Sequence, residues 1–256
     1  MASVRAEFHE RGRPAAPAPM ARACITGHLG EFLQGRIGRA GPVALITLPC
    51  PALAVTARAW PAPALSLSDA AAGLIQPGAA RAVLSRLGRP LAAHVTMRAD
   101  MPAGGGAGAS TAALMALAHL AGAGRLPPDR LARACLAAEG ASDPLMHPAP
   151  ARLLWASRAG RSVRRLPPPP AFEVVGGFLG PPRATDPSET DFPDIADLIA
   201  PWAAAAACGD HARLAALAGE SAARRIGSAL AGDPTPALAR RMGAPGWAIG
   251  HTGPAR

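Results

Sequence analysis

The sequence contains no tyrosine and no lysine, and aromatic residues make up only 4% of its 256 positions. All 26 basic residues are therefore arginines, and against 17 acidic residues they give a formal net charge of +9. Binding to nucleic acid or to an anionic membrane requires a basic patch. Adjacent arginines occur only at 164–165, 224–225 and 240–241. We therefore expect neither nucleic acid nor a membrane as a partner.

The sequence also lacks a metal-binding cysteine motif and a membrane segment. Its cysteines are far apart, with no Cys-x-x-Cys pair and no histidine at metal-ligand spacing; they are Cys24, Cys50, Cys135 and Cys208. No charge-free run reaches the roughly 18 apolar residues of a transmembrane helix, and the charged N-terminus has no signal-peptide core. These absences predict a cytoplasmic protein without disulfides.

Composition divides the chain into a tail and two lobes. Residues 1–19 are polar and then rich in proline and alanine, which predicts a disordered tail. The run Pro167–Pro170 is the clearest linker and separates an N-terminal lobe, 20–166, from a C-terminal lobe, 171–256. Apolar patterning predicts strands at 22–25, 43–48, 53–59, 91–100, 153–156, 163–166 and 172–177, a turn at 27–30, and helices at 78–87, after 109, 129–139, 195–208 and 211–231.

The most informative stretch is the glycine-rich segment 101–113. It separates the strand-like run 91–100 from a helix-like run with Leu114, Leu117 and Leu120 at three-residue spacing. A turn of this kind aims backbone N–H groups and the positive end of a helix dipole at one point. The segment therefore predicts a site for a phosphate group.

Several motifs compete for this loop. A Walker A loop requires a lysine that the chain lacks, so that interpretation fails. Gly104, Gly106 and Ala109 fit a dinucleotide fingerprint loosely, but the acidic residue expected about twenty residues later falls in a proline loop at Asp129. A flexible linker before a helix N-cap explains Ser110 but not the glycine spacing.

Four segments together resemble the GHMP kinases (galacto-, homoserine, mevalonate and phosphomevalonate kinases). Their glycine loop has the pattern Pro-x-x-x-Gly-Leu-Gly-Ser-Ser-Ala, on which Pro102, Gly106, Gly108, Ser110 and Thr111 fall. The other three segments resemble the propanediol-utilisation or L-threonine kinase branch; they are Gly30-Glu-Phe-Leu-Gln-Gly35, Glu139-Gly-Ala-Ser-Asp-Pro-Leu-Met146 and His251-Thr-Gly253. The resemblance covers roughly residues 21–253.

The resemblance implies an α+β fold with two lobes. The N-terminal lobe would be like ribosomal protein S5 domain 2 and the C-terminal lobe ferredoxin-like, with ATP between them. It implies transfer of a phosphoryl group to a small alcohol, and for this branch to L-threonine in cobalamin side-chain synthesis. The implied ATP-binding residues are Pro102, Gly104, Gly105, Gly106, Ala107, Gly108, Ala109, Ser110 and Thr111.

Polar residues near these motifs complete the expected site. Ser110 and Glu139 would supply oxygen ligands to Mg²⁺, although Glu139 could simply end a helix in solvent. Asp143 would orient or deprotonate the acceptor hydroxyl, or make a local turn before a proline. Glu31 and Gln34 would bracket an amino-acid substrate, or be polar hairpin residues. The same analysis predicts structural roles for His28 and His251.

The chain departs from the family pattern at several positions. It has no lysine to pair with the acidic catalyst, and Arg22 is the expected substitute. Ala107 and Ala109 remove a hydroxyl from the phosphate loop, and Ala113 stands where the threonine-kinase branch carries aspartate. The sequence stops three residues after Gly253, so we expect a C-terminal lobe that lacks one strand. These departures leave a second hypothesis open, a catalytically degenerate nucleotide-binding protein that acts through a partner.

Overall fold

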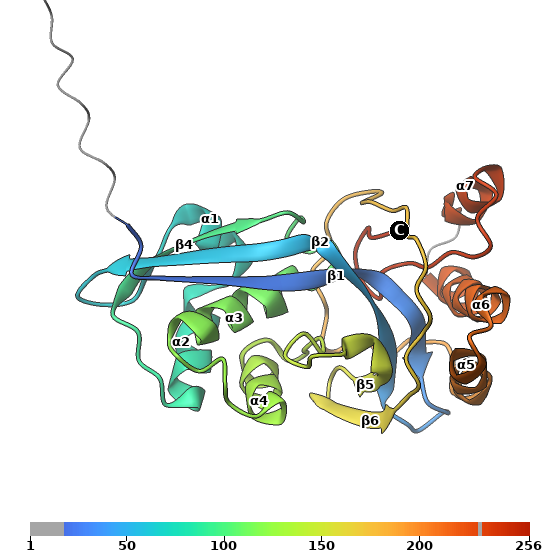
Figure 1. Cartoon of the computed structure of the whole chain (residues 1–256), viewed down its shortest axis with the longest axis horizontal. Helices are drawn as coiled ribbons and strands as arrows, with labels where there is room; N and C mark the ends of the chain where they lie inside the picture. Colours follow the sequence, from blue (N-terminus) through green and yellow to red (C-terminus); the bar gives the residue numbers. More distant parts are fainter. Residues whose placement is uncertain (1–17, 230–231) are drawn as a thin grey trace, which may run out of the picture.

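A computed structural model describes residues 18–229 and 232–256 (Figure 1). The tail predicted at residues 1–19 lies almost entirely outside the described residues. Two long strands organise the rest of the chain. Strands β1 (Ala21–Arg36) and β2 (Val43–Pro61) form an antiparallel hairpin, from which the remaining strands and the helices are built.

The second edge of β2 is shared by two different strands. Its C-terminal half pairs with β4 (Ala93–Ala99), and near its start Leu45 pairs with Trp155 of β5. The sheet order is β3-β4-β2-β5-β6, with β1 on the other side of β2; the remaining strands are β3 (Ser66–Leu67), β5 (Leu153–Ala156) and β6 (Arg161–Arg165). The two strands predicted at 43–48 and 53–59 are therefore one strand.

Strand β1 continues through the turn that the sequence predicted at 27–30. Its register with β2 shifts between Thr26 and Gly27, between His28 and Glu31, and between Glu31 and Leu33. Gly30 takes up the irregularity with φ of +75°. Glycine adopts this left-handed conformation without the steric cost that a side chain imposes. Bulges of this kind redirect side chains without ending a strand.

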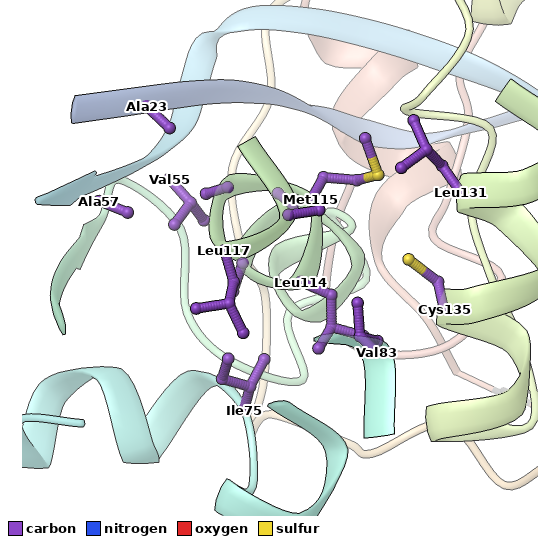
Figure 2. Close-up of a cluster of buried hydrophobic side chains, with 14 of the residues drawn as sticks. Ala23, Val55, Ala57, Ile75, Val83, Leu114, Met115, Leu117, Leu131 and Cys135 are labelled. Carbon is purple, nitrogen blue, oxygen red and sulfur yellow. The ribbon is translucent and has the colours of Figure 1, made fainter. Parts of the chain in front are cut away.

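Four helices cover one face of the sheet (Figure 1); they are α1 (Asp69–Leu74), α2 (Pro77–Leu87), α3 (Ala109–Leu120) and α4 (Pro128–Glu139). Helix α3 is central and almost entirely buried, because its alanines allow close packing against β1 and β2. Figure 2 shows its Leu114, Met115 and Leu117 among side chains from the sheet and the neighbouring helices. This apolar core fixes the first turn of α3, which contains Ser110.

A second apolar cluster joins the C-terminal helices to the other end of the hairpin. Helices α5 (Ala196–Cys208) and α6 (His211–Ala229) form its outer side, and α7 (Thr235–Arg241) follows. Trp202 is fully buried, with its ring centroid 4.9 Å from that of Phe32 in β1. The cluster therefore contains residues of both predicted lobes, and the boundary between the lobes stays a prediction.

The mixed α+β fold class is confirmed, but the described C-terminal part contains little strand. The strand predicted at 172–177 is wrong: this segment is irregular and exposed, with Val175 80% exposed. The prolines at 167–170 just before it and the paired Gly176 and Gly177 at its end leave few residues able to form a ladder. Within the described residues, the expected ferredoxin-like sheet is reduced to isolated bridges such as Phe178 to Ala255.

Two further findings concern the described residues only. Their four cysteines are free, and Cys135 is buried beside α3. No helix that the structure describes is both long enough and apolar enough to cross a membrane.

Candidate functional site

A cleft of about 530 Å³ opens where the bulge of β1, the glycine loop, the end of α4 and the C-terminal segment meet. Its lining contains residues from every motif identified in the sequence. The polar and charged residues that line it are His28, Glu31, Ser110, Thr111, Glu139, Ser142, Asp143, Ser157, Arg158, Arg183, Thr185, His251 and Thr252. Segments more than 200 residues apart in sequence therefore form one site.

The glycine loop forms one wall of the cleft. Gly104, Gly106 and Gly108 line it and have positive φ values of +70°, +75° and +73°. A side chain at Gly106 would overlap the carbonyl oxygen of Thr252, so a glycine is required there. Of the predicted ATP-binding residues, these glycines, Ser110 and Thr111 line the cleft, whereas Pro102, Gly105, Ala107 and Ala109 do not.

The loop leads directly into the N-terminus of α3. The N-cap residue, Gly108, has no side chain to cap the helix, and the first helical bond runs from the Ala112 N–H to the Gly108 carbonyl at 2.8 Å. The preceding N–H groups of the first turn have no acceptor within the helix. Together with the helix dipole they favour an anion. Because Ala109 is buried, it could contribute to such a site only through its backbone.

Ser110 and Glu139 meet at the cleft. The Ser110 hydroxyl donates a hydrogen bond to Glu139 Oε2, which joins the first turn of α3 to the last turn of α4. Burial raises the pKa of Glu139, although this hydrogen bond opposes the shift. A hydroxyl and a carboxylate are hard oxygen donors of the kind that Mg²⁺ accepts alongside phosphate oxygens. In the described part of the chain no three His, Cys, Asp or Glu side chains group into a metal site, so these two would need ligands from a nucleotide.

Asp143 lies beyond the end of α4, beside the first turn of α3. Its backbone N–H donates to the Thr111 hydroxyl at 3.3 Å, and its side chain is 24% exposed. Burial alone would raise the pKa of Asp143. The charge of His28, whose Nε2 lies 3.4 Å from Asp143 Oδ2, and smaller contributions that include the Thr111 hydroxyl together outweigh burial and lower this pKa. Asp143 is therefore ionised at neutral pH and accessible from the cleft.

His28 projects into the cleft from the β1 bulge, although the sequence predicted only a structural role for it. It is only 2% exposed, and its Nδ1 lies 3.3 Å from the Gly30 carbonyl oxygen and 3.6 Å from Glu31 Oε1. Burial lowers the pKa of His28, but the nearby charges of Asp143 and Glu31 and the contact with the Gly30 carbonyl raise it to about 9. The available sequence signal was its position between two glycines in the turn predicted at 27–30.

Glu31 and Gln34 occupy different environments, although the sequence paired them. Glu31 lines the cleft but is 2% exposed, and its Oε2 accepts a 2.5 Å hydrogen bond from the His251 N–H. Burial raises the pKa of Glu31 to about 7. Gln34 is not in the lining; its Nε2 donates to the Ile249 carbonyl at 2.8 Å and its backbone N–H to the Ser221 hydroxyl. Gln34 thus links β1 to the C-terminal part.

The cleft contains two arginines that sequence reasoning did not identify. Arg158, after β5, bonds through its guanidinium to the Glu189 and Asp186 carbonyls. The Arg183 N–H donates to the Gly104 carbonyl at 2.8 Å, which holds this residue beside the glycine loop. Arg22, the expected substitute for lysine, is exposed on β1 and does not line the cleft. Scattered single arginines gave no signal in the sequence.

His251 completes the cleft from the C-terminal segment. Its ring stacks on Phe192 at 4.5 Å with an interplanar angle of 5°, and the Arg225 guanidinium also lies over Phe192, 4.5 Å from the ring centroid. Burial, followed by the charges of Arg225 and Arg158, lowers the pKa of His251 to about 3. His251 is therefore neutral at physiological pH.

Comparison with known proteins identifies the fold. No protein-family model and no curated protein sequence matches the chain. Among solved structures, mevalonate kinase of L. major in complex with R-mevalonate is similar with a TM-score of 0.56 and 16% identity, over 95% of this chain and 87% of that one. Homoserine kinase of Cytophaga hutchinsonii is similar with a TM-score of 0.51 and 16% identity, over 94% and 85%. The chain therefore has the fold of these two kinases.

Proposed function

We propose that this protein is an ATP-dependent small-molecule kinase that transfers the γ-phosphoryl group to a hydroxyl. One observation carries the proposal: the uncapped N-terminus of α3, the Ser110–Glu139 pair and an ionised Asp143 line the same cleft. Phosphoryl transfer depends mainly on positioning and on neutralising phosphate charge. The cleft provides residues suited to both tasks.

The phosphate groups of ATP would lie along the glycine loop. Gly104, Gly106 and Gly108 contribute backbone to the cleft lining, and the first N–H groups of α3 are available as donors. Arg158 and Arg183 add positive charge to the cleft lining. A backbone cradle with two arginines can bind a triphosphate without the lysine that the chain lacks.

The Ser110 hydroxyl and the Glu139 carboxylate would hold Mg²⁺ together with phosphate oxygens. The bound ion would neutralise charge on the phosphates. Burial disfavours a lone ionised Glu139, as its raised pKa indicates, so a nearby cation would be favoured by this carboxylate. The proposed Mg²⁺ contact therefore fits the oxygen donors of Ser110 and Glu139 and the negative charge of the Glu139 carboxylate.

Asp143 would orient the acceptor hydroxyl and accept its proton. The acceptor oxygen forms a bond to the γ-phosphorus, the bond from that phosphorus to the β,γ-bridging oxygen breaks, and ADP leaves. The hydroxyl proton passes to the Asp143 carboxylate and then to solvent. Because its pKa is lowered, Asp143 is ionised before the acceptor binds.

We propose L-threonine as the acceptor, in cobalamin side-chain synthesis. The support is the resemblance of three segments to the threonine-kinase branch, and all three contribute residues to the cleft: Glu31, Asp143 and His251. The similar solved structures are a homoserine kinase and a mevalonate kinase bound to R-mevalonate, both kinases of small hydroxylated acids. A cytoplasmic location remains a prediction from the sequence.

A second candidate is a nucleotide-binding protein of the same fold that has lost catalysis. The observation that favours it is the absence of lysine, together with the buried Ala107 and Ala109, which provide no hydroxyl to the phosphate loop. Under this alternative the protein would bind ATP and act through a partner.

Release of ADP from Mg-ATP separates the two candidates. The assay uses L-threonine, L-serine, L-homoserine and mevalonate as acceptors, with nucleotide affinity measured in parallel by calorimetry. For the kinase we expect threonine-dependent turnover that Asp143→Asn lowers by about 10²- to 10⁴-fold, with unchanged ATP affinity. Asp129→Asn, in the first turn of α4 and outside the cleft lining, is the matched control and should be fully active. ATP binding without turnover of any acceptor would establish the alternative.

A further inference from the structure

Three ionisable side chains form a row at the inner end of the cleft. His28 Nδ1 lies 3.6 Å from Glu31 Oε1, and His28 Nε2 lies 3.4 Å from Asp143 Oδ2. The imidazole therefore has a carboxylate at each of its nitrogens. His28 and Glu31 are each 2% exposed, whereas Asp143 at 24% faces the open cleft.

Folding of β1 produces this row. The register shifts between His28 and Glu31 and on to Leu33 break the alternation of the strand, so both polar side chains reach the cleft. In a regular strand, residues three positions apart point to opposite faces. The Gly30 carbonyl, 3.3 Å from Nδ1, further fixes the ring. A backbone bond from the His28 N–H to the Ala107 carbonyl, at 3.1 Å, ties the bulge to the glycine loop.

Other ionisable groups face the row from the neighbouring elements. The Glu139 carboxylate at the end of α4 has its pKa raised by burial and by the charge of Asp143, and the Arg158 guanidinium after β5 lines the same cleft. From the C-terminal segment comes His251, whose pKa is lowered to about 3 chiefly by burial. From α3 comes the uncharged Thr111 hydroxyl, bonded to the Asp143 N–H. Burial lowers the pKa of His28, and the two carboxylates outweigh it, raising the pKa to about 9. The ring is thus an imidazolium at neutral pH.

We propose that His28 is a positioning residue that orients Asp143, and that Glu31 holds His28 in place rather than binding the acceptor. This inference rests on the proposed kinase function for its catalytic consequence. The chain has no lysine, and Arg22 lies outside the cleft, so His28 supplies the positive charge beside Asp143. A buried charge of this kind keeps the carboxylate ionised and directed at the acceptor.

The contacts of Glu31 support the second half of the proposal. One of its oxygens faces His28 and the other accepts the hydrogen bond from the His251 N–H at 2.5 Å. With only 2% of its side chain exposed, the carboxylate has little surface to offer an acceptor ammonium group. Its partners are protein groups that join β1 to the C-terminal segment.

Two measurements test the row independently of each other. The first is NMR titration of the His28 imidazole in the full chain, assigned by its loss in His28→Gln. We expect a pKa of about 9 in the native protein, lowered by about 1–3 units in Glu31→Gln and in Asp143→Asn. His94→Gln is the matched control and should leave the His28 pKa unchanged, because His94 hydrogen-bonds to the exposed Ser66 on the outer part of the sheet.

The second measurement is steady-state kinetics with Mg-ATP and L-threonine. A positioning role predicts that His28→Gln lowers kcat by about 100-fold while the calorimetric ATP affinity stays unchanged. Glu31→Gln should lower kcat and leave the KM for threonine unchanged. A Glu31 that binds the acceptor would instead raise KM at constant kcat, which would overturn this role.

A negative outcome of each measurement would reject a different claim. Absence of turnover with every acceptor would reject the kinase function, and the titration would still decide the arrangement of the three residues. A His28 pKa near its ordinary value of 6.5, unaffected by Glu31→Gln, would overturn the inference whatever the activity. If His28→Gln folds poorly, through-bond correlations in the native protein assign the His28 resonance instead, so the decision does not depend on that variant.

Discussion

Replacing Gly106 by alanine should test whether the C-terminal segment is packed against the glycine loop. Gly106 has φ of +75°, and an added Cβ would overlap the Thr252 carbonyl oxygen. The left-handed conformation costs a non-glycine residue roughly 1–2 kcal/mol, and forcing an extra carbon into a packed region adds about 1–3 kcal/mol. We therefore expect Gly106→Ala to lower the free energy of unfolding by about 3 kcal/mol.

Gly122→Ala is the matched control for the conformational cost. Gly122 has φ of +72°, but a Cβ at this position would have no other atom within 4 Å, so only the strain of about 1–2 kcal/mol applies. Urea unfolding followed by circular dichroism measures both variants. For a protein of this size, 3 kcal/mol corresponds to a fall in Tm of about 6–12 °C. Equal destabilisation of the two variants would refute the packing of the C-terminal segment on this loop.

Three other perturbations have defined outcomes. Trp155→Phe should lower the free energy of unfolding by about 2–4 kcal/mol in urea titrations, because the fully buried indole donates a 2.6 Å hydrogen bond to the Ser142 carbonyl. Arg225→Met should cost about 3–5 kcal/mol by removing the buried partner of the half-buried Glu189, and adding Glu189→Gln should recover part of that loss if the ion pair is responsible. The pKa of His28 is raised, so its protonation should add about 3 kcal/mol to the free energy of unfolding. This stabilisation should be complete below pH 6.5 and be lost as pH rises through about 9. Urea midpoints from about pH 6 to 10 should fall in this way in the native protein and not in His28→Gln.

Local patterning predicted the longer helices but missed the short helices α1 and α7. The apolar repeat and the following glycine residues predicted α3, α4 and α5 within a residue or two of their observed bounds, because helical hydrogen bonds connect near neighbours. The strands were harder. The predicted breaks at 27–30 and at 49–52 proved to be irregularities within two long strands, since pairing between β1 and β2 continues across them.

The candidate site was predicted in outline but not in detail. The glycine motif pointed to Ser110 and Thr111 and the segment 139–146 to Glu139 and Asp143; all four line one cleft, and their roles stay predictions. Gln34 looked equivalent to Glu31 in the sequence, three residues away. Residues three positions apart lie on opposite faces of a regular strand, and here Glu31 reaches the cleft while Gln34 bonds to the Ile249 carbonyl. His28 shares the cleft with Glu31 because the register shifts between them. Sequence spacing alone could not reveal the bulge.

The sequence by itself predicted a phosphate-binding loop, because glycine spacing and an uncapped helix start are local features of the backbone. It also excluded a lysine-dependent site, since there is no lysine anywhere in the chain. Only the tertiary structure decided which cation stands beside Asp143. That choice depends on His28 being carried into the cleft by a strand bulge and closed in by a segment more than 200 residues later, and contacts over such distances leave no periodic signal in the sequence.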